Sequence, residues 1–204
     1  MKKHGNLIVI SGPSGVGKST LIKRVREELT DLQFSVSCTT RAPRQGEVDG
    51  RDYYFLSDEE FAKRLAAEEF LEHAGVFKHS YGTLRSEVSA RIERGEEVVL
   101  DIDVQGAKQI REAMKNDPLI AAAAQFIIIA PPDLKTLETR LCNRNSETPE
   151  QLKLRLDGAV SELKNFRLYD FMIVNGDLET AAADLTGVLK SIRLRTQNIV
   201  GEVF

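Results

Sequence analysis

Hydrophobic residues gather in short, uninterrupted runs along this chain instead of alternating strictly with polar residues. Four runs dominated by aliphatic side chains occupy residues 7–10, 98–102, 126–130 and 171–174. Runs of this length and composition are typical of strands in a parallel sheet that is buried on both faces. The pattern therefore predicts a buried parallel sheet.

Segments long enough to form helices separate and follow these runs. Residues 18–29 are amphipathic, residues 103–115 and 133–143 show a similar pattern, and Asp177 is placed to cap a last helix. Strands that alternate with helices are joined by right-handed crossovers. The fold class predicted from this alternation is α/β.

Residues 35–85 depart from the alternation and are interpreted as an inserted subdomain. The segment holds three of the four tyrosines, turn-forming proline and glycine, and short alternating runs such as residues 53–56, which predict antiparallel strands. A capping box that begins at Ser57 predicts one helix. We expect Phe34, Phe61 and Phe70 to form the core of this insert.

A second interruption covers residues 140–157, which are polar and rich in arginine. Pro149 stands where a proline is well tolerated, at the expected first position of a helix. The segment separates the last two predicted strands and is interpreted as a second excursion from the core.

The composition is that of an ordinary globular chain. Of 204 residues, 42% are hydrophobic and 29% are charged, so wholesale disorder is not expected. The 28 Lys and Arg residues nearly balance the 31 Asp and Glu residues, which argues against a nucleic-acid or membrane-surface partner. The most apolar stretch, residues 119–130, falls short of the roughly 20 residues that a membrane-spanning helix needs.

Cysteine usage indicates the cellular compartment. Cys38 and Cys142 are the two cysteines, and they lack the spacing of a zinc site or a disulfide framework. No signal-peptide cleavage pattern follows the N-terminus. These features predict a cytoplasmic protein with reduced thiols.

Residues 12–19 match the phosphate-binding pattern G-x-x-x-x-G-K-[ST] in full. The first predicted strand enters the pattern and an amphipathic helix leaves it, which is the context that the motif requires. Glycines allow backbone N–H groups to turn toward phosphate oxygens, and the helix N-terminus adds positive potential. Lys18 would bridge the β- and γ-phosphates and Ser19 would hold Mg²⁺. The alternative, a glycine turn that matches by chance, is much less favoured in this context.

Asp101 and Asp103 follow the second predicted strand. Carboxylates at the carboxyl edge of a parallel strand face the ligand crevice, so either residue is a candidate to order the magnesium shell, directly or through water. The two side chains share one face of the strand if the strand extends that far. Asp103 is also suited to cap the following helix, and both roles stay open.

Several stretches of the sequence together resemble the guanylate kinase family. They are residues 10–20 (ISGPSGVGKST), 39–44 (TTRAPR), 46–53 (GEVDGRDY), 100–106 (LDIDVQG), 129–132 (IAPP) and 173–175 (IVN). The phosphate-binding loop alone is generic, whereas T-T-R-x-P-R-x-G-E combined with L-D-I-D-x-Q-G is specific. The resemblance covers residues 4–192.

The resemblance implies a P-loop NTPase core of three α/β/α layers with a parallel sheet, an inserted mixed α+β subdomain that binds GMP, and a helical lid. The guanylate kinase-like domain would cover residues 5–188. Its parts would be the core (5–34, 86–139 and 158–192), the GMP-binding insert (35–85) and the lid (140–157), followed by a C-terminal tail (193–204).

The resemblance also implies an activity, the transfer of the γ-phosphoryl group of ATP to GMP, and to dGMP. The products would be ADP and GDP, in purine nucleotide metabolism and GMP recycling. Mg²⁺ would be the cofactor, and ATP and GMP the small-molecule partners, with no nucleic acid and no membrane. The protein would be a cytoplasmic monomer or homodimer.

Four residues are expected at the phosphate of GMP. Arg41 and Arg44 can each present a planar pair of donors to a phosphate, although loop arginines are often merely solvated. The resemblance implies that Tyr53 and Tyr81 donate their hydroxyl groups to the same phosphate.

Four further residues are expected at the guanine base. The resemblance implies that the Glu72 carboxylate accepts the N1–H and N2–H₂ donors of guanine, with Asp101 assisting. Ser37 and Thr83 would donate hydroxyl groups to O6. A site that hydrogen-bonds one base in this way rejects other bases, because its polar groups would be left unpaired.

ATP is expected at the phosphate-binding loop and after the last strand. The implied set is Gly12, Pro13, Ser14, Gly15, Val16, Gly17, Lys18, Ser19, Thr20 and Asn175. Arg140, Arg144 and Arg155 of the lid would close over the phosphates and act with Lys18 as catalytic residues. One helical face could carry both Arg140 and Arg144, although surface ion pairs are the commoner role of such arginines.

Two positions depart from the family pattern. Asn145 stands where a glycine is frequent in the lid, and Gly176 stands where an acidic residue is common. Asparagine tolerates left-handed backbone geometry better than most residues, so closure of the lid is still expected.

Two other functions are compatible with parts of the pattern. A kinase for another small phosphate ester, such as ribose 1,5-bisphosphate, would not need the base-binding set Glu72, Ser37 and Thr83. A non-catalytic guanylate-kinase-like module that binds phosphorylated peptides usually lacks the phosphate-binding loop, which is intact here. Both features favour a kinase that acts on GMP.

Overall fold

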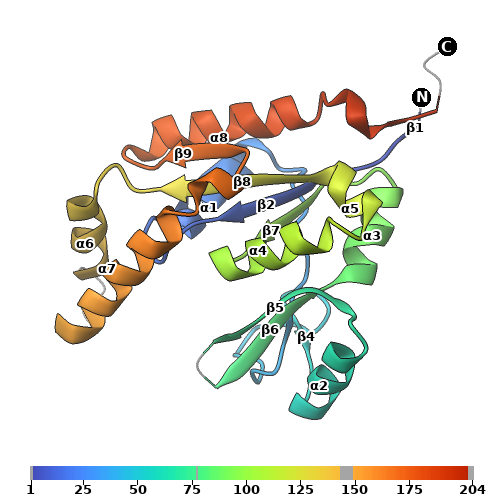
Figure 1. Cartoon of the computed structure of the whole chain (residues 1–204), viewed down its shortest axis with the longest axis horizontal. Helices are drawn as coiled ribbons and strands as arrows, with labels where there is room; N and C mark the ends of the chain where they lie inside the picture. Colours follow the sequence, from blue (N-terminus) through green and yellow to red (C-terminus); the bar gives the residue numbers. More distant parts are fainter. Residues whose placement is uncertain (1, 77, 143–148, 202–204) are drawn as a thin grey trace.

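A computed structural model describes residues 2–76, 78–142 and 149–201. Its central sheet has four parallel strands in the order β7-β2-β8-β9: β2 (Leu7–Ser11), β7 (Val98–Asp101), β8 (Ala124–Ala130) and β9 (Phe171–Val174) (Figure 1). All neighbouring strands pair in parallel, so the predicted parallel sheet is confirmed.

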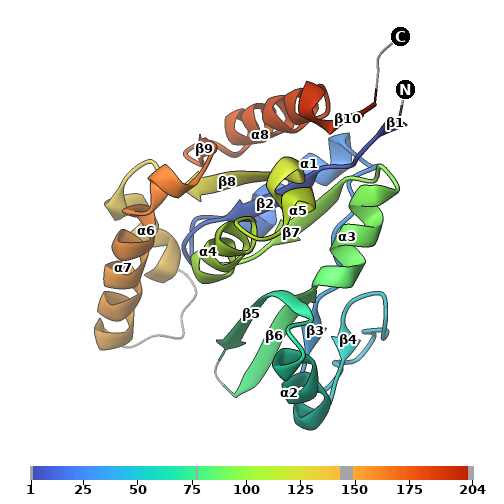
Figure 2. The same cartoon turned by 45° about the vertical axis from the view of Figure 1, so that its right-hand side comes forward.

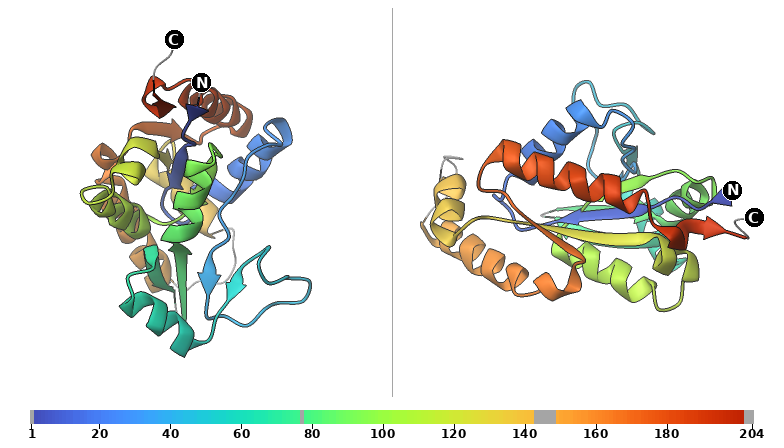
Figure 3. Two further views of the ribbon diagram at one scale, coloured as in Figure 1. Left: turned by 90° about the vertical axis from the view of Figure 1, so that its right-hand side faces the viewer. Right: turned by 90° about the horizontal axis from the view of Figure 1, so that it is seen from above.

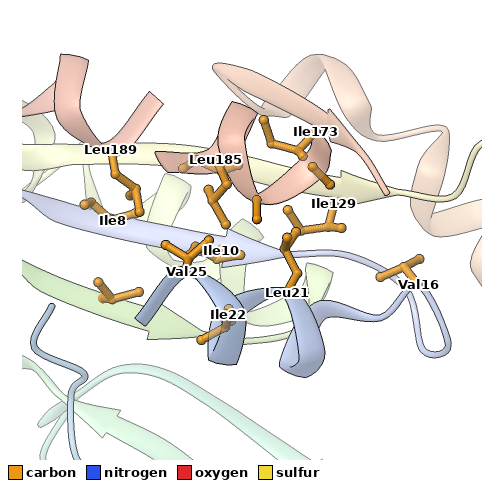
Figure 4. Packing of buried hydrophobic residues seen from close by; sticks show 14 of the residues in the cluster. Ile8, Ile10, Val16, Leu21, Ile22, Val25, Ile129, Ile173, Leu185 and Leu189 are labelled. Atoms are coloured by element: carbon orange, nitrogen blue, oxygen red, sulfur yellow. The ribbon is translucent and has the colours of Figure 1, made fainter. Parts of the chain in front are cut away.

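Helices cover both faces of this sheet. One face carries α1 (Lys18–Glu28) and α8 (Leu178–Ile192), and the other carries α3 (Arg85–Glu93), α4 (Val104–Ala113) and α5 (Pro118–Ala123) (Figure 3). Side chains alternate along a strand, so Ile8 and Ile10 pack on the first face while Leu7 and Val9 pack on the second. Figure 4 shows Ile10 beside Val25 of α1. The three-layer α/β/α core is therefore confirmed.

A second, smaller sheet is built from residues between α1 and α3. Its order is β4-β3-β6-β5, with β3 (Cys38–Thr39), β4 (Tyr54–Phe55), β5 (Phe70–Val76) and β6 (His79–Leu84), and α2 (Asp58–Ala66) lies beside it (Figure 2). β3 and β5 run antiparallel to β6, but β4 runs parallel to β3, so the antiparallel prediction was wrong at β4. The long, turn-rich loop after β3 returns the chain to the same end of the sheet, which makes a parallel pair possible.

The three phenylalanines expected in the insert divide between two cores. Phe61 and Phe70 stack with ring centroids 4.5 Å apart and pack with Cys38 in the small core of the second sheet. Phe34 instead packs against the main core, and its backbone forms a parallel bridge with Val99 of β7. The expectation for Phe34 was wrong because the segment that enters the insert first runs beside β7.

Local capping signals behave as predicted. The Ser57 hydroxyl accepts a 3.1 Å hydrogen bond from the Glu60 N–H at the start of α2, and Asp177 accepts one of 2.9 Å from the Thr180 N–H at the start of α8. Pro149 is the first residue of α7 (Pro149–Leu163). This helix and α6 (Leu134–Cys142) form an arm at one end of the central sheet (Figure 1).

The first and last strands of the described chain pair with each other away from the phosphate-binding loop (Figure 1). β1 (Lys2–Lys3) pairs antiparallel with β10 (Ile199–Val200), which follows the short helix η2 (Thr196–Asn198); another short helix, η1 (Phe166–Leu168), precedes β9. The buried carboxamides of Asn198 and Asn6 are hydrogen-bonded to each other. In the part of the chain that is described, no helix is both long and apolar enough to cross a membrane.

Candidate active site at the carboxyl ends of the central strands

The phosphate-binding loop joins the end of β2 to the start of α1, as its motif predicts. Gly15 and Gly17 have φ angles of 90° and 87°, a region that residues with a side chain rarely adopt. A Cβ atom on Gly17 would also lie 2.6 Å from Nδ2 of Asn175. The loop borders a hollow of about 290 Å³ whose lining includes Ser19 and Asp103. Its shape therefore depends on glycine.

Lys18, the first residue of α1, reaches the end of β7. Its Nζ lies 2.8 Å from Oδ1 of Asp101 and donates a 2.8 Å hydrogen bond to the carbonyl oxygen of Ile102. Neither charged side chain is fully solvated, with exposed fractions of 17% for Lys18 and 35% for Asp101. The structure thus brings together the loop lysine and the strand-end carboxylate that the sequence singled out.

Asp101 and Asp103 differ in position because β7 ends at Asp101. Asp103 is the N-cap of α4, and its Oδ1 accepts a 2.8 Å hydrogen bond from the Gly106 N–H. The two carboxylates therefore do not share a strand face, and the strand is shorter than the run of hydrophobic residues suggested. Asp103 still borders the hollow of the loop.

The oxygen donors around this hollow suit Mg²⁺. Within residues 2–76, 78–142 and 149–201, no three histidine, cysteine, aspartate or glutamate side chains form a metal-binding cluster. Mg²⁺ typically takes one or two protein oxygens and completes its octahedral shell with water and substrate phosphates. Ser19 lines this hollow together with Asp103, and it lines a neighbouring hollow together with Asp101. The hydroxyl and the two carboxylates form a donor set of this kind.

Asn175 and Arg140 hold another side of the loop. Asn175 follows β9, is 5% exposed, and donates a 2.8 Å hydrogen bond from Nδ2 to the carbonyl oxygen of Val16. Arg140 of α6 donates to the same carbonyl at 3.2 Å and to that of Gly176 at 3.3 Å. Sequence reasoning missed this support for the loop, because Asn175 and Val16 are 159 positions apart.

A hollow of about 320 Å³ lies beside Arg140 and Asn175, and Gly176 and Leu178 also border it. Arg155 is an exposed residue of α7. Arg144, with Asn145, falls within residues 143–148 and lies outside the described residues, so the helical face predicted for Arg140 and Arg144 is not described either.

Glu72 is a buried carboxylate on β5, with 6% of the residue exposed. The Thr83 hydroxyl donates a 2.6 Å hydrogen bond to its Oε1. A β-bulge between Phe70 and Glu72 accommodates Leu71, whose side chain packs into the main core. Burial raises the pKa of Glu72, and the charge of Asp103 acts in the same direction. Such a carboxylate gains most from a ligand that brings further N–H donors.

A pocket of about 190 Å³ lies between the two sheets. Its lining residues are Phe34, Ser35, Ser37, Asp52, Tyr53, Thr83, Leu100, Asp101 and Ile102. Half of the predicted GMP-binding set therefore meets in one pocket, which Glu72 adjoins through its hydrogen bond to Thr83. Asp52 was not predicted to line this pocket. It lies within residues 46–53, which resemble the family, and this stretch was the signal that could have identified it.

Arg41, Tyr53 and Tyr81 also come together. The guanidinium of Arg41 lies 5.4 Å from the ring centroid of Tyr53, whose ring meets that of Tyr81 edge-on at 6.2 Å. Glu47, which sequence reasoning did not assign, pairs with Arg41 at 2.8 Å and accepts a 2.7 Å hydrogen bond from the Arg44 N–H. The hydrogen bond to Glu47 raises the pKa of Arg41, so this cation is firmly charged. The Arg44 side chain is exposed.

A phosphate-binding loop at the carboxyl end of a parallel strand is the nucleotide site of a P-loop phosphotransferase. A second pocket adjoins it here, because Asp101 lines that pocket and pairs with Lys18 of the loop. Comparison with known proteins narrows this class. The sequence profile of the family described as Guanylate kinase matches residues 4–192. The chain belongs to the guanylate kinase family.

Individual relatives agree with this assignment. The chain is 42% identical to a guanylate kinase of Clostridium perfringens (strain SM101 / Type A) over 196 residues, which cover 96% of this chain and 88% of the relative. It is 44% identical to the guanylate kinase of Thermotoga maritima over 191 residues, 94% of this chain and 89% of the relative. The crystal structure of guanylate kinase from Anaplasma phagocytophilum superposes with a TM-score of 0.73 at 34% identity, covering 98% of this chain and 92% of that one.

Proposed function

We propose that this chain transfers the γ-phosphoryl group of ATP to GMP by binding ATP at the phosphate-binding loop and GMP in the pocket between the two sheets. Family membership supports the reaction. The position of Asp101 supports the location, because this residue lines the acceptor pocket and pairs with Lys18 of the loop. One side chain thus adjoins both sites, as the close approach of two reacting phosphates requires.

The loop would bind ATP through its backbone. Backbone N–H groups of residue 12 and residues 14–20, together with the N-terminus of α1, offer donors and positive potential to the phosphates. Lys18 would leave Asp101 for the β- and γ-phosphates. Asn175 would act indirectly, by holding the Val16 carbonyl and hence the loop.

Mg²⁺ would be held by the Ser19 hydroxyl, with Asp101 or Asp103 contributing through water. When bound, the ion would neutralise charge on the β- and γ-phosphates and help to align them. Within the chain, the Asp103 cap fixes the start of α4 next to this position.

The base of GMP would be selected by Glu72. Its carboxylate would accept N1–H and N2–H₂ of guanine in place of the Thr83 hydroxyl. Thr83 would then donate to O6 together with Ser37, and Asp101 would assist. Adenine offers neither N1–H nor a 2-amino group, so it would leave the buried Glu72 without donors.

The phosphate of GMP would be bound by Arg41, Arg44, Tyr53 and Tyr81. Arg41 is already oriented by Glu47 and by the Tyr53 ring. A phosphate dianion carries more charge than the Glu47 carboxylate and presents more acceptor oxygens, so it would compete well for the guanidinium.

In the transfer, an oxygen of the GMP phosphate attacks the γ-phosphorus, and the bond from that phosphorus to the bridging oxygen of ADP breaks. Negative charge spreads over the oxygens of the transferring group. Lys18, Arg140, Arg144 and Arg155 would stabilise this charge. Arg140 already contacts the loop through the Val16 carbonyl.

We assign the moving parts to the predicted segments, the insert to residues 35–85 and the lid to residues 140–157. We also propose that the protein is a cytoplasmic monomer or homodimer that accepts dGMP. Both cysteines are free, and burial raises the pKa of the Cys38 thiol to about 11, which protects it from oxidation.

A coupled assay of ADP release tests the acceptor. With GMP, dGMP, AMP, CMP and ribose 1,5-bisphosphate offered separately, we expect GMP to exceed AMP in kcat/KM by about 10⁴ or more. The Glu72→Gln variant should lose most of this preference. Equal rates with all nucleotides would refute the guanine site, a preference for the sugar phosphate would favour the rival kinase, and absence of ADP release would favour a binding module.

A further inference from the structure

Gln109 makes an unusual pair of contacts to the strand that carries Glu72. Oε1 of Gln109, on α4, accepts a 2.9 Å hydrogen bond from the His73 N–H, and its Nε2 donates a 2.7 Å hydrogen bond to the His73 carbonyl. One side-chain amide therefore satisfies both backbone groups of a residue 36 positions away. His73 follows Glu72 directly.

The position of β5 explains what this contact does. β5 is an edge strand of the second sheet, and β6 is its strand partner. The outward N–H and C=O groups of an edge strand need another partner. A carboxamide carries the same donor and acceptor as a peptide group, so Gln109 takes the place of a neighbouring strand. It thereby joins the second sheet to a helix of the central core.

A second contact lies one turn earlier on α4. A Cβ atom on Gly106 would lie 2.8 Å from Oε2 of Glu72 and 3.2 Å from Cδ1 of Ile102, so the carboxylate rests directly against the helix backbone. Its other oxygen accepts the hydrogen bond from Thr83. Gly106 and Gln109 thus face β5 together, the first leaving space for the carboxylate and the second holding its backbone.

We propose that Gln109 is a positioning residue for base selection, which acts by holding the β5 backbone so that both oxygens of Glu72 keep the orientation that guanine needs. This inference rests on the proposed role of Glu72. A carboxylate that accepts N1–H and N2–H₂ together must lie in the plane of the base, so a small rotation loses one of the two bonds. Loss of Gln109 releases the edge of β5 and permits that rotation.

Discrimination between GMP and IMP tests the proposal, because hypoxanthine retains N1–H and lacks the 2-amino group. We expect Gln109→Leu, which fills the space without hydrogen bonding, to lower the GMP:IMP ratio of kcat/KM about tenfold and to leave KM for ATP within about twofold. Glu112→Leu is the matched control, since Glu112 is an exposed residue of the same helix that pairs with Lys115. This control should keep the wild-type ratio.

A second variant covers the case in which Gln109→Leu folds poorly. Gln109→Glu keeps the acceptor for the His73 N–H and loses the donor to the His73 carbonyl, so its ratio should lie between those of the wild type and Gln109→Leu. Protection of the His73 amide against hydrogen exchange should fall in Gln109→Leu, which lacks the acceptor. A wild-type ratio in either folded Gln109 variant would overturn the proposal, even if stability falls. Glu72→Gln, measured in parallel, separates the two hypotheses: if it also keeps the wild-type ratio, the role of Glu72 itself is wrong.

Discussion

At the scale of single residues, paired charges organise the site. Lys18 and Arg41 each contact a carboxylate, Asp101 and Glu47 respectively. These pairs orient the two cations. A phosphate would still displace the carboxylate from each cation, because it offers more charge and more acceptor oxygens than one carboxylate. Although the net charge of the chain is −3, Lys18 and Arg41 are cations that a nucleotide phosphate would bind in place of their carboxylate partners.

Replacement of Lys18 by methionine should lower kcat by about 10³-fold or more, because it removes a cation that stabilises the transferring group. The partly exposed pair with Asp101 contributes about 1 kcal/mol or less, so the melting temperature should change by only a few degrees. Steady-state kinetics and thermal unfolding monitored by circular dichroism measure both quantities. Turnover near that of the wild type would contradict the role assigned to Lys18.

Burial of Glu72 predicts a pH dependence. Its pKa is raised above the ordinary value of 4.5, so as pH falls the side chain takes up a proton earlier than an exposed glutamate. Because the protonated form loses an acceptor for guanine, kcat/KM for GMP should decline on the acid side from a pH above 4.5. The phosphate of GMP also titrates on the acid side of this pH profile. Glu72→Gln is the control, because the pH profile of this variant keeps the contribution of the GMP phosphate and loses that of Glu72. An identical acid limb in both proteins would contradict the prediction.

The same shift affects stability with a definite sign. Between pH 4.5 and the raised pKa of Glu72, the folded protein binds more protons at this residue than the unfolded chain does. The contribution of Glu72 to stability therefore falls as pH rises through this window. Ionised Glu72 is maintained at a cost in stability, which a site for a specific ligand tolerates.

At the scale of elements, the phosphate-binding loop depends on β9 as much as on β2 and α1. The residue after β9, Asn175, holds the Val16 carbonyl and leaves no space for a side chain at Gly17. Arg140 of α6 contacts the same carbonyl. Two elements that are distant from the loop in sequence, α6 and β9, thus help to determine the path of the loop.

Gly17→Ala should destabilise the protein by about 1–3 kcal/mol and impair ATP binding, because alanine is disfavoured at φ 87° and its Cβ would meet Asn175. Gly187→Ala is a matched control. Gly187 is an exposed residue of α8 with nothing within 4 Å of an added Cβ, so this change should stabilise the protein by about 0.5–1 kcal/mol. Urea unfolding and ATP titration measure these effects. Equal effects of the two substitutions would count against the loop geometry.

At the scale of the whole molecule, the two proposed substrate sites share a boundary. Asp101 lies on the wall of the acceptor pocket and is paired with Lys18 of the loop. The second sheet contacts the core through the two hydrogen bonds between Gln109 and His73. It is also joined to the core by the segment at Phe34, which runs beside β7. Because water must be excluded from transfer, we expect the insert and the arm formed by α6 and α7 to close when both nucleotides bind.

A non-hydrolysable ATP analogue should increase the affinity for GMP about tenfold, because Lys18 would leave Asp101 for the phosphates and free this carboxylate for guanine. Isothermal titration calorimetry with and without the analogue measures the effect. Small-angle scattering should show a smaller radius of gyration with both nucleotides than with either alone. Equal GMP affinities together with unchanged scattering profiles would rule out this coupling.

The sequence by itself determined the features that depend on neighbouring residues. Runs of hydrophobic residues predicted the parallel sheet, and the caps at Ser57 and Asp177 were predicted from single turns of helix. The phosphate-binding loop was predicted because its motif stands between β2 and α1. These predictions succeed because backbone preference and helix capping act over only a few positions.

Only the tertiary structure decided the contacts between distant residues. The parallel direction of β4, the place of Phe34 in the main core and the bond from Asn175 to Val16 were not visible in local patterns. The same holds for Gln109 and His73, since the donor and acceptor of an amide side chain reveal nothing about their partner until the chain has folded. Burial and pairing of polar groups are properties of the assembled core, and they determine which residues of this family pattern are held rigidly.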